Sequence, residues 1–126
     1  MVNFGERSSV PARFAGRNFY QHNAQVTLMR TTPDECRELG RIIGGKVSRY
    51  QAPVSVLLPR RAISVISAPG QAFHDPVADE ALFSSLRAHL RPGIPVLELD
   101  REINDPAFAR ACADALLAHL AARKPA

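Results

Sequence analysis

The feature that most constrains the fold is a strand-like segment that runs directly into a capped amphipathic helix. Residues 25–29 are rich in strand-forming side chains. Thr32 suits the N-cap of the following helix, Pro33 suits its first position, and Glu35 completes a capping box with Thr32. Apolar side chains then recur at helical spacing, at Cys36, Leu39, Ile42, Ile43 and Val47. This pattern predicts a strand over 25–29 and a helix over about 33–50, the first half of a βαβ unit.

The same arrangement recurs twice along the chain. Apolar segments at 53–59 and 95–99 predict two further strands. Asp75-Pro76 and Asp105-Pro106 predict the starts of two further helices, with Asn104 as the alternative cap of the last one. The expected apolar stripe of the last helix is Phe108, Ala111, Cys112, Ala115, Leu116 and Leu120. The order β-α-β-α-β-α predicts an α/β fold: a three-layer open parallel sheet of about three strands, in a Rossmann-like or flavodoxin-like half-domain.

Residues 1–21 show no periodicity and are predicted to form an extended N-terminal arm held by its aromatic side chains, with 22–126 as a single α/β domain. A sheet of only three parallel strands leaves both of its edges unpaired unless the arm, another subunit or a second polypeptide covers them. We therefore expect a homo-oligomer, most simply a dimer, or a companion chain that carries missing N-terminal sequence. Residues 1–21 are the expected exchanged or clasping element.

The pair Gly44-Gly45 interrupts the first predicted helix, and each glycine costs on the order of 1 kcal/mol relative to alanine. Two interpretations remain open from the sequence. Either the helix stops or bends at this pair, or another backbone packs closely against the two glycines.

Composition narrows the class of protein. With 126 residues and 46% apolar residues, the chain is expected to be one globular domain, and no apolar run approaches the roughly 20 residues that a membrane span requires. Without a signal-peptide core, a cytoplasmic location is expected. The net charge is +4, but the arginines are scattered and do not alternate with aromatic residues, so no specific nucleic-acid binding is expected. Cys36 and Cys112 have no partners at ligand spacing and are expected to be core thiols, not ligands of a metal site.

In an open parallel sheet, ligands bind beyond the carboxyl ends of the strands. The loop 60–75, which follows the second predicted strand, is sixteen residues long, and loops of that length in compact domains are often functional. The candidate ligand-binding residues at this rim are Arg30, Thr31, Thr32, Arg60, Arg61, Ser64, Gly70, His74 and Asp75.

Each group of rim residues has a plain structural alternative. Thr32 is expected to cap its helix in preference to binding an anion, because acidic residues already follow it. Arg60-Arg61 beside Ser64 is a better anion candidate, although paired surface arginines are commonly only solvated. His74-Asp75 is a candidate acid–base pair, yet Asp75 is also needed as a helix cap. No catalytic residue is assigned. No Gly-rich phosphate loop or hydrolase motif is present in the chain, so a self-contained nucleotide site is not expected.

Several blocks of the chain resemble a known family. They include the segments 1–5, 19–23 and 26–32, then Val56-Leu57-Leu58-Pro59 leading to Ala68-Pro69-Gly70, Phe73-His74-Asp75-Pro76, and Ile103-Asn104-Asp105-Pro106. The series resembles the C-terminal part of the ATP-binding proteins similar to the tomato mosaic virus resistance protein. Ala62 and Ser67 stand where the family pattern implies glycine and aspartate, and the second departure weakens any acidic role at that loop.

Members of that family are longer and have an N-terminal nucleotide-binding domain. The resemblance therefore implies ATP binding for the parent architecture without placing ATP on these residues, and the cofactor of this chain is unknown. We expect a C-terminal α/β fragment of a nucleotide-linked protein that completes a small-molecule or anion site at its rim. The alternative is a protein–protein interaction or oligomerisation module with no active site of its own.

Overall fold

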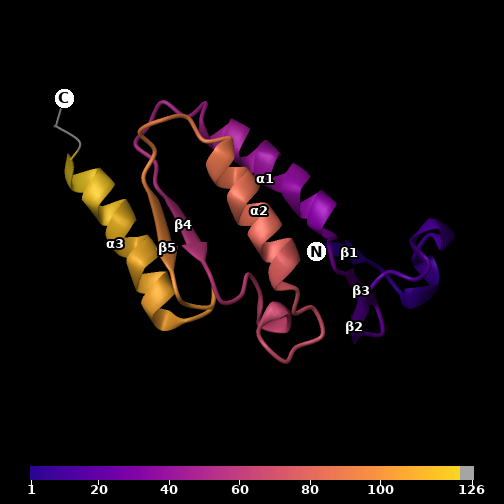
Figure 1. The fold of residues 1–126 in the computed structure, drawn as a ribbon. Helices are drawn as coiled ribbons and strands as arrows, with labels where there is room; N and C mark the ends of the chain where they lie inside the picture. The colour runs from indigo at the N-terminus through magenta and orange to yellow at the C-terminus, as the bar shows by residue number, and fades with distance from the viewer. Residues whose placement is uncertain (123–126) are drawn as a thin grey trace.

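The computed structural model describes residues 1–122 and is drawn in Figure 1. Its five strands are β1 Val2–Phe4, β2 Phe19–Asn23, β3 Val26–Met29, β4 Val56–Pro59 and β5 Val96–Leu99. The α-helices are α1 Pro33–Val47, α2 Pro76–Ala88 and α3 Pro106–Ala122, and short 3-10 turns occupy Arg7–Ser9, Ala12–Phe14 and Val65–Ser67. The α/β class, and the alternation of strand and helix from residue 26 onward, are confirmed.

The pairing of the strands corrects one part of the expected sheet. β4 and β5 form a two-stranded parallel sheet in which Val56 lies opposite Val96. β3 does not join them, because it is the central strand of a separate antiparallel sheet in the order β1-β3-β2. β2 and β3 are joined by only residues 24–25, and closing such a short hairpin costs little chain entropy. The segment expected to be an extended arm thus supplies strands on both sides of β3, which leaves β3 no free edge for β4.

The helices are arranged around β4 and β5 in layers. Figure 1 shows α2 between α1 and the parallel sheet, with α3 on the opposite side of that sheet. Leu58 of β4 packs with Phe83 and Leu86 of α2 to form the buried apolar core. On the α3 side, the Ser55 hydroxyl lies 2.9 Å from Nε2 of His119.

Two glycines set the spacing between α1 and α2. A Cβ atom on Gly40 would lie 2.5 Å from the carbonyl oxygen of Leu82, and one on Gly44 would lie 2.8 Å from that of Leu86. Helix α1 continues through both glycines to Val47. Close backbone packing is therefore the correct interpretation at Gly44. It does not apply to Gly45, where an added Cβ would meet nothing within 4 Å.

Because α2 approaches along these glycines, the large apolar side chains of α1 are turned away from it. The buried residues of α1 are Cys36, Gly40 and Gly44. The expected stripe residues Leu39, Ile42 and Ile43 are 37–40% exposed. Periodicity identified the helix correctly, but the small residues form the inner face because they allow the closest approach of a second helix.

Helix α3 shows a similar departure. Phe108 is buried and Cys112 is half-buried, as the predicted stripe requires. Leu116 and Leu120 of the same stripe are 58% and 50% exposed. Within residues 1–122, no helix combines the length and the apolar character that crossing a bilayer requires.

Candidate functional site

A small recess lies between the carboxyl end of β4 and the first turns of α2. It has a volume of about 100 Å³. Three predicted rim residues, Arg60, Arg61 and His74, line it together with Pro76, Asp79, Glu80 and Phe83 of α2. A water molecule occupies roughly 30 Å³ of liquid volume, so the recess has room for a small functional group and not for a nucleotide.

An ion pair lies behind this recess. Nη2 of Arg30, at the end of β3, is 2.5 Å from Oδ1 of Asp79 and 3.2 Å from the carbonyl oxygen of Asp75. The Arg30 side chain is only 4% exposed. Its Nε and Nη1 groups have no hydrogen-bond partner among the described residues. Buried donors without partners are uncommon in proteins, so these two N–H groups are an exception that needs an explanation.

Arg60 belongs to a closed ring of four ion pairs. It contacts Glu80 at 2.7 Å and Glu98 at 3.3 Å, while Arg87 contacts the same two carboxylates at 2.8 and 2.6 Å. The Arg60 guanidinium also lies over the ring of Phe83. Burial raises the pKa of Glu80, but the hydrogen bonds from Arg60 and Arg87 outweigh this effect and hold the pKa below its ordinary value. The ring joins the ends of β4 and β5 to α2.

Arg61 is also neutralised by a carboxylate. Its Nε and Nη2 donate to the two oxygens of Asp100 at 2.8 and 2.9 Å. This bidentate hydrogen bonding lowers the pKa of the Asp100 carboxyl. The two rim arginines are therefore not free cations, and an anionic ligand would have to displace carboxylates of the protein.

His74 and Asp75 have separate structural roles. Nδ1 of His74 lies 3.3 Å from the carbonyl oxygen of Ser67. The carboxylate of Asp75 accepts a hydrogen bond from the backbone N–H of Ala78 at 2.9 Å and so caps α2. Of the two interpretations of Asp75, the helix cap is the one that the structure contains.

The remaining rim residues lie away from the recess. Thr32 forms the expected capping box with Glu35, and the hydroxyl of Thr31 accepts from the thiol of Cys36. The carbonyl oxygen of Ser64 accepts from the Ser67 hydroxyl, and Gly70 has a φ of 80° in the loop. The structure thus brings Arg60, Arg61 and His74 together, with Arg30 and Asp75 behind them.

Three residues that line the recess were missed by sequence reasoning, namely Asp79, Glu80 and Phe83. All three come from α2, of which the sequence predicted the start at Asp75-Pro76. Arg30 is the residue from which Asp79 could have been inferred. A charged side chain at the end of a buried strand requires a partner of opposite charge in the interior.

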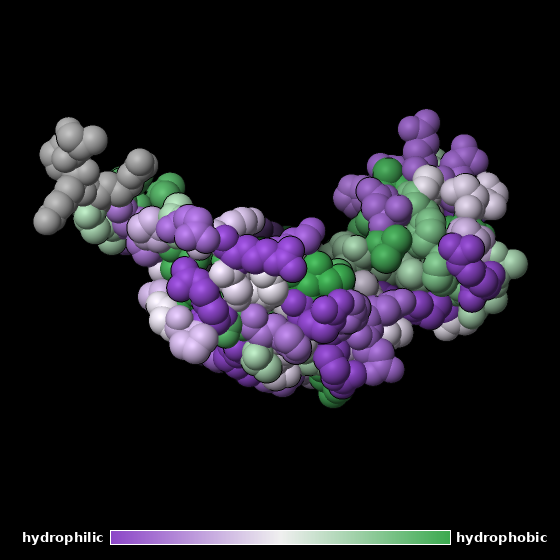
Figure 2. Space-filling view, turned by 90° about the horizontal axis from the view of Figure 1, so that it is seen from above, coloured by the Kyte–Doolittle hydropathy of each residue, from purple (hydrophilic) through white to green (hydrophobic). Residues whose placement is uncertain are grey.

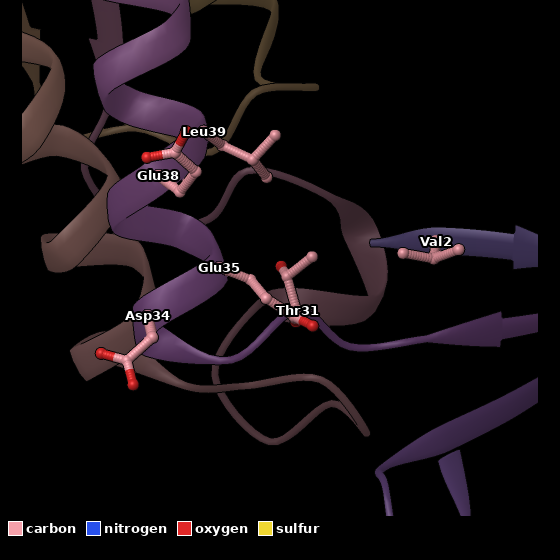
Figure 3. A pocket seen from close by; sticks show the side chains of 6 residues that line it. All are labelled: Val2, Thr31, Asp34, Glu35, Glu38 and Leu39. Atoms are coloured by element: carbon pink, nitrogen blue, oxygen red, sulfur yellow. The ribbon is translucent and has the colours of Figure 1, made fainter. Parts of the chain in front are cut away.

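A larger and more open hollow of about 520 Å³ lies between β1 and the start of α1. Figure 3 shows Val2 approaching it from β1, while Thr31, Glu35 and Leu39 come from the segment that begins α1. The hydrogen bond from Arg17 to Glu35 lowers the pKa of that carboxyl and ties the N-terminal segment to α1. In Figure 2 the surface is indented between the N-terminal sheet and the helical body, with hydrophobic residues at the base.

Comparison with known proteins places this fold in a family. Residues 1–120 match the C-terminal domain of the uncharacterised protein family UPF0261. A UPF0261 protein of Rhizobium meliloti is 45% identical over 113 residues, which are 88% of this chain and 28% of that protein. A UPF0261 protein of Clostridium tetani is 41% identical over 118 residues, 93% of this chain and 29% of that protein.

A plant protein is also similar. The ToMV resistance protein Tm-1 of Solanum lycopersicum is 38% identical over 119 residues, which are 93% of this chain and 16% of that protein. The chain therefore spans less than a third of the length of these relatives. The resemblance that its sequence blocks indicated is confirmed. The chain belongs to the UPF0261 family and corresponds to a C-terminal part of its proteins.

Proposed function

We propose that this chain is a ligand-completing C-terminal α/β unit of a UPF0261 protein, and that its recess holds one anionic group of a larger small-molecule ligand. The observation that carries the proposal is Arg30, which is buried behind the recess with two N–H groups unpartnered. Its partner Asp79 lines the recess directly.

The size of the recess supports a subsite in preference to a complete site. A volume of about 100 Å³ accommodates a carboxylate or a phosphate group and little more. The relatives are more than three times as long as the matched segment, so the rest of the ligand would contact sequence outside this chain. The sequence predicted a small-molecule or anion site at the rim of the sheet. The proposal keeps that function and restricts it to Arg60, Arg61 and His74, with the ion pair of Arg30 and Asp79 behind them.

The charge balance of the recess indicates how an anion would bind. Glu80 already pairs with Arg60 and Asp100 with Arg61, so an incoming carboxylate or phosphate exchanges with these two carboxylates for hydrogen bonds from the arginines. Such an exchange replaces one ion pair of an arginine with another. The net gain is therefore small, and we expect the binding of the anion to be weak in this chain alone. It should become stronger when the remaining part of the family's polypeptide contacts the rest of the ligand.

Ligand-induced thermal shift tests the proposal with a matched pair of variants. The first, Arg61→Ala with His74→Ala, removes two lining side chains and leaves the Arg60 ring intact. The second, Arg110→Ala with His22→Ala, removes the same side-chain types from exposed positions. Inorganic phosphate, acetate and ATP are the probes. At least one probe should raise the melting temperature of the wild type and of the second variant, but not that of the first. Equal shifts in all three proteins would rule out the recess.

A further inference from the structure

Helix α1 has an outward face that the fold of this chain does not cover. Leu39, Ile42 and Ile43 are each 37–40% exposed there. Charges of opposite sign flank them along the helix, with Glu35 and Glu38 toward its start and Lys46 and Arg49 toward and beyond its end. Lys46 and Arg49 form no ion pair within the described part of the chain. The face is therefore an apolar centre with one acidic and one basic end.

A hollow of about 210 Å³ lies on the same face, around Gly45. Ile42, Gly45, Lys46 and Arg49 border it together with Arg41. The first four are spaced i, i+3, i+4 and i+7, which is the four-residue hole that receives a side chain from a facing helix. Gly45 leaves this hole open, although nothing in its own chain lies within 4 Å of a Cβ at that position.

Among residues 1–122, no close contact requires a glycine at position 45. A glycine inside a helix makes the helix less stable than an alanine would. Gly40 and Gly44 repay that cost through the close approach of α2, but Gly45 does not. A side chain from outside the chain would account for it.

We propose that two copies of the chain pair through α1, antiparallel and about a two-fold axis that passes close to Ile42. In this register Leu39 of one copy enters the hole over Gly45 of the second copy. Glu38 then faces Lys46 of the second copy. Because a two-fold interface uses the same patch on both chains, every one of these contacts occurs twice.

The apolar and the charged contacts select the same register independently. Leu39 and Gly45 lie at equal distances along the sequence before and after Ile42. The same is true of Glu38 and Lys46, so both kinds of contact place the two-fold axis at Ile42. The antiparallel direction also sets the helix dipoles in their favourable relation. Glu38 already pairs with Arg41 at 2.6 Å, but both side chains are more than half exposed. Such an exposed pair contributes little to stability and does not prevent Glu38 from meeting a second cation.

A single helix pair is a small interface, so the dimer should form in the micromolar range and not more tightly. Its charged ends are solvent-exposed, and high salt should weaken it without abolishing it. Because the α1 face is complementary to itself about the two-fold axis, the proposed partner is a second copy of this chain. In this dimer the N-terminal strands stay paired with β3 of their own chain.

Sedimentation equilibrium of the full chain from micromolar to millimolar concentration tests the proposal. The wild type should be a reversible monomer–dimer mixture. Gly45→Leu fills the hole, and its Cβ would meet nothing within 4 Å. Because leucine also favours the helix more than glycine does, the variant should have a higher melting temperature while its dimer is abolished. Ala118→Leu adds a similar side chain to the exposed side of α3 and should leave the dimer unchanged.

A charge exchange tests the register. Lys46→Glu alone should weaken the dimer by about tenfold, because two attractive pairs become repulsive. Combining it with Glu38→Lys should restore wild-type association. Ile42→Cys should form a disulfide-linked dimer on mild oxidation, whereas Leu117→Cys should not.

Three results would overturn the proposal. The first is a wild-type chain that remains monomeric at millimolar concentration, which would assign the α1 face to another partner. The second is a dimer that survives Gly45→Leu. The third is failure of the double charge exchange to restore an association that Lys46→Glu has weakened.

Discussion

Arg30 and Asp79 form an ion pair although 49 residues of sequence separate them. Arg30 ends β3 of the antiparallel sheet, and Asp79 lies in the first turn of α2. Their side chains are only 4% and 11% exposed. The pair is the buried polar connection between the N-terminal sheet and the helical body.

Removing one member of this pair should destabilise the fold strongly. Arg30→Met leaves the Asp79 carboxylate buried without its cation, which typically costs about 3–5 kcal/mol. Urea denaturation measures this as a shift of the midpoint at constant slope. The double variant Arg30→Met with Asp79→Leu should recover much of the loss, because both charges are then absent. If the double variant loses the sum of the two single effects, the pair contributes no coupling energy.

The two neighbouring glycines of α1 should respond to alanine in opposite directions. Gly44→Ala forces a Cβ to within 2.8 Å of the Leu86 carbonyl oxygen and should destabilise the fold by roughly 1–3 kcal/mol. Gly45→Ala has free space around it and should stabilise the fold by up to about 1 kcal/mol. Thermal denaturation of the two variants side by side gives both signs. Destabilisation by Gly45→Ala would mean that the helix is not regular at this point.

Acid should weaken the ring of ion pairs around Arg60 and Arg87. The pKa of Glu80 in the folded protein lies below the ordinary value of 4.5, so its charged form favours the folded state. The stabilisation is present above about pH 4.5 and is lost as the pH falls through the folded-state pKa. The free energy of unfolding should therefore fall less steeply below this pH in Glu80→Gln than in the wild type. Glu6→Gln, at an exposed residue outside the ring, should retain the wild-type slope.

Deleting residues 1–21 should disrupt the N-terminal end of the molecule. β3 would lose β1 and most of β2, and its fully buried Thr27 and Met29 would face solvent. The unpaired strand should then promote aggregation, which light scattering detects. Arg17→Ala, which removes the contacts to Glu35 and to the carbonyl oxygen of Arg30, should remain soluble and lose on the order of 1 kcal/mol. A soluble, folded deletion variant would show that β3 does not need its neighbours.

Local signals in the sequence predicted the helices well. All three begin at the expected prolines, Pro33, Pro76 and Pro106, because capping depends on residues within a few positions of one another. The close packing at Gly44 was one of two alternatives that the sequence left open. A glycine inside a helix either interrupts the helix or allows another backbone to pack closely against it.

Relationships between distant residues could not be predicted in the same way. β3 pairs with β1 and β2 and not with β4, and period-2 alternation carries no information on which strands become neighbours. The charge partners of Arg60 and Arg61 come from α2 and the end of β5, so a cluster of two arginines resembled an anion site. Asp79 was missed because its partner lies 49 positions away.

The ion pair between Arg30 and Asp79 can form only late in synthesis, because Asp79 is added 49 residues after Arg30. A ribosome adds about 5–20 residues per second, so Arg30 leaves it roughly 2 to 10 seconds before its partner. The three strands of the N-terminal sheet are complete by residue 29, and during that interval the sheet carries a cation that has no carboxylate to receive it. The growing chain can form its first hairpin early, but it must keep the end of β3 in water until α2 has been made.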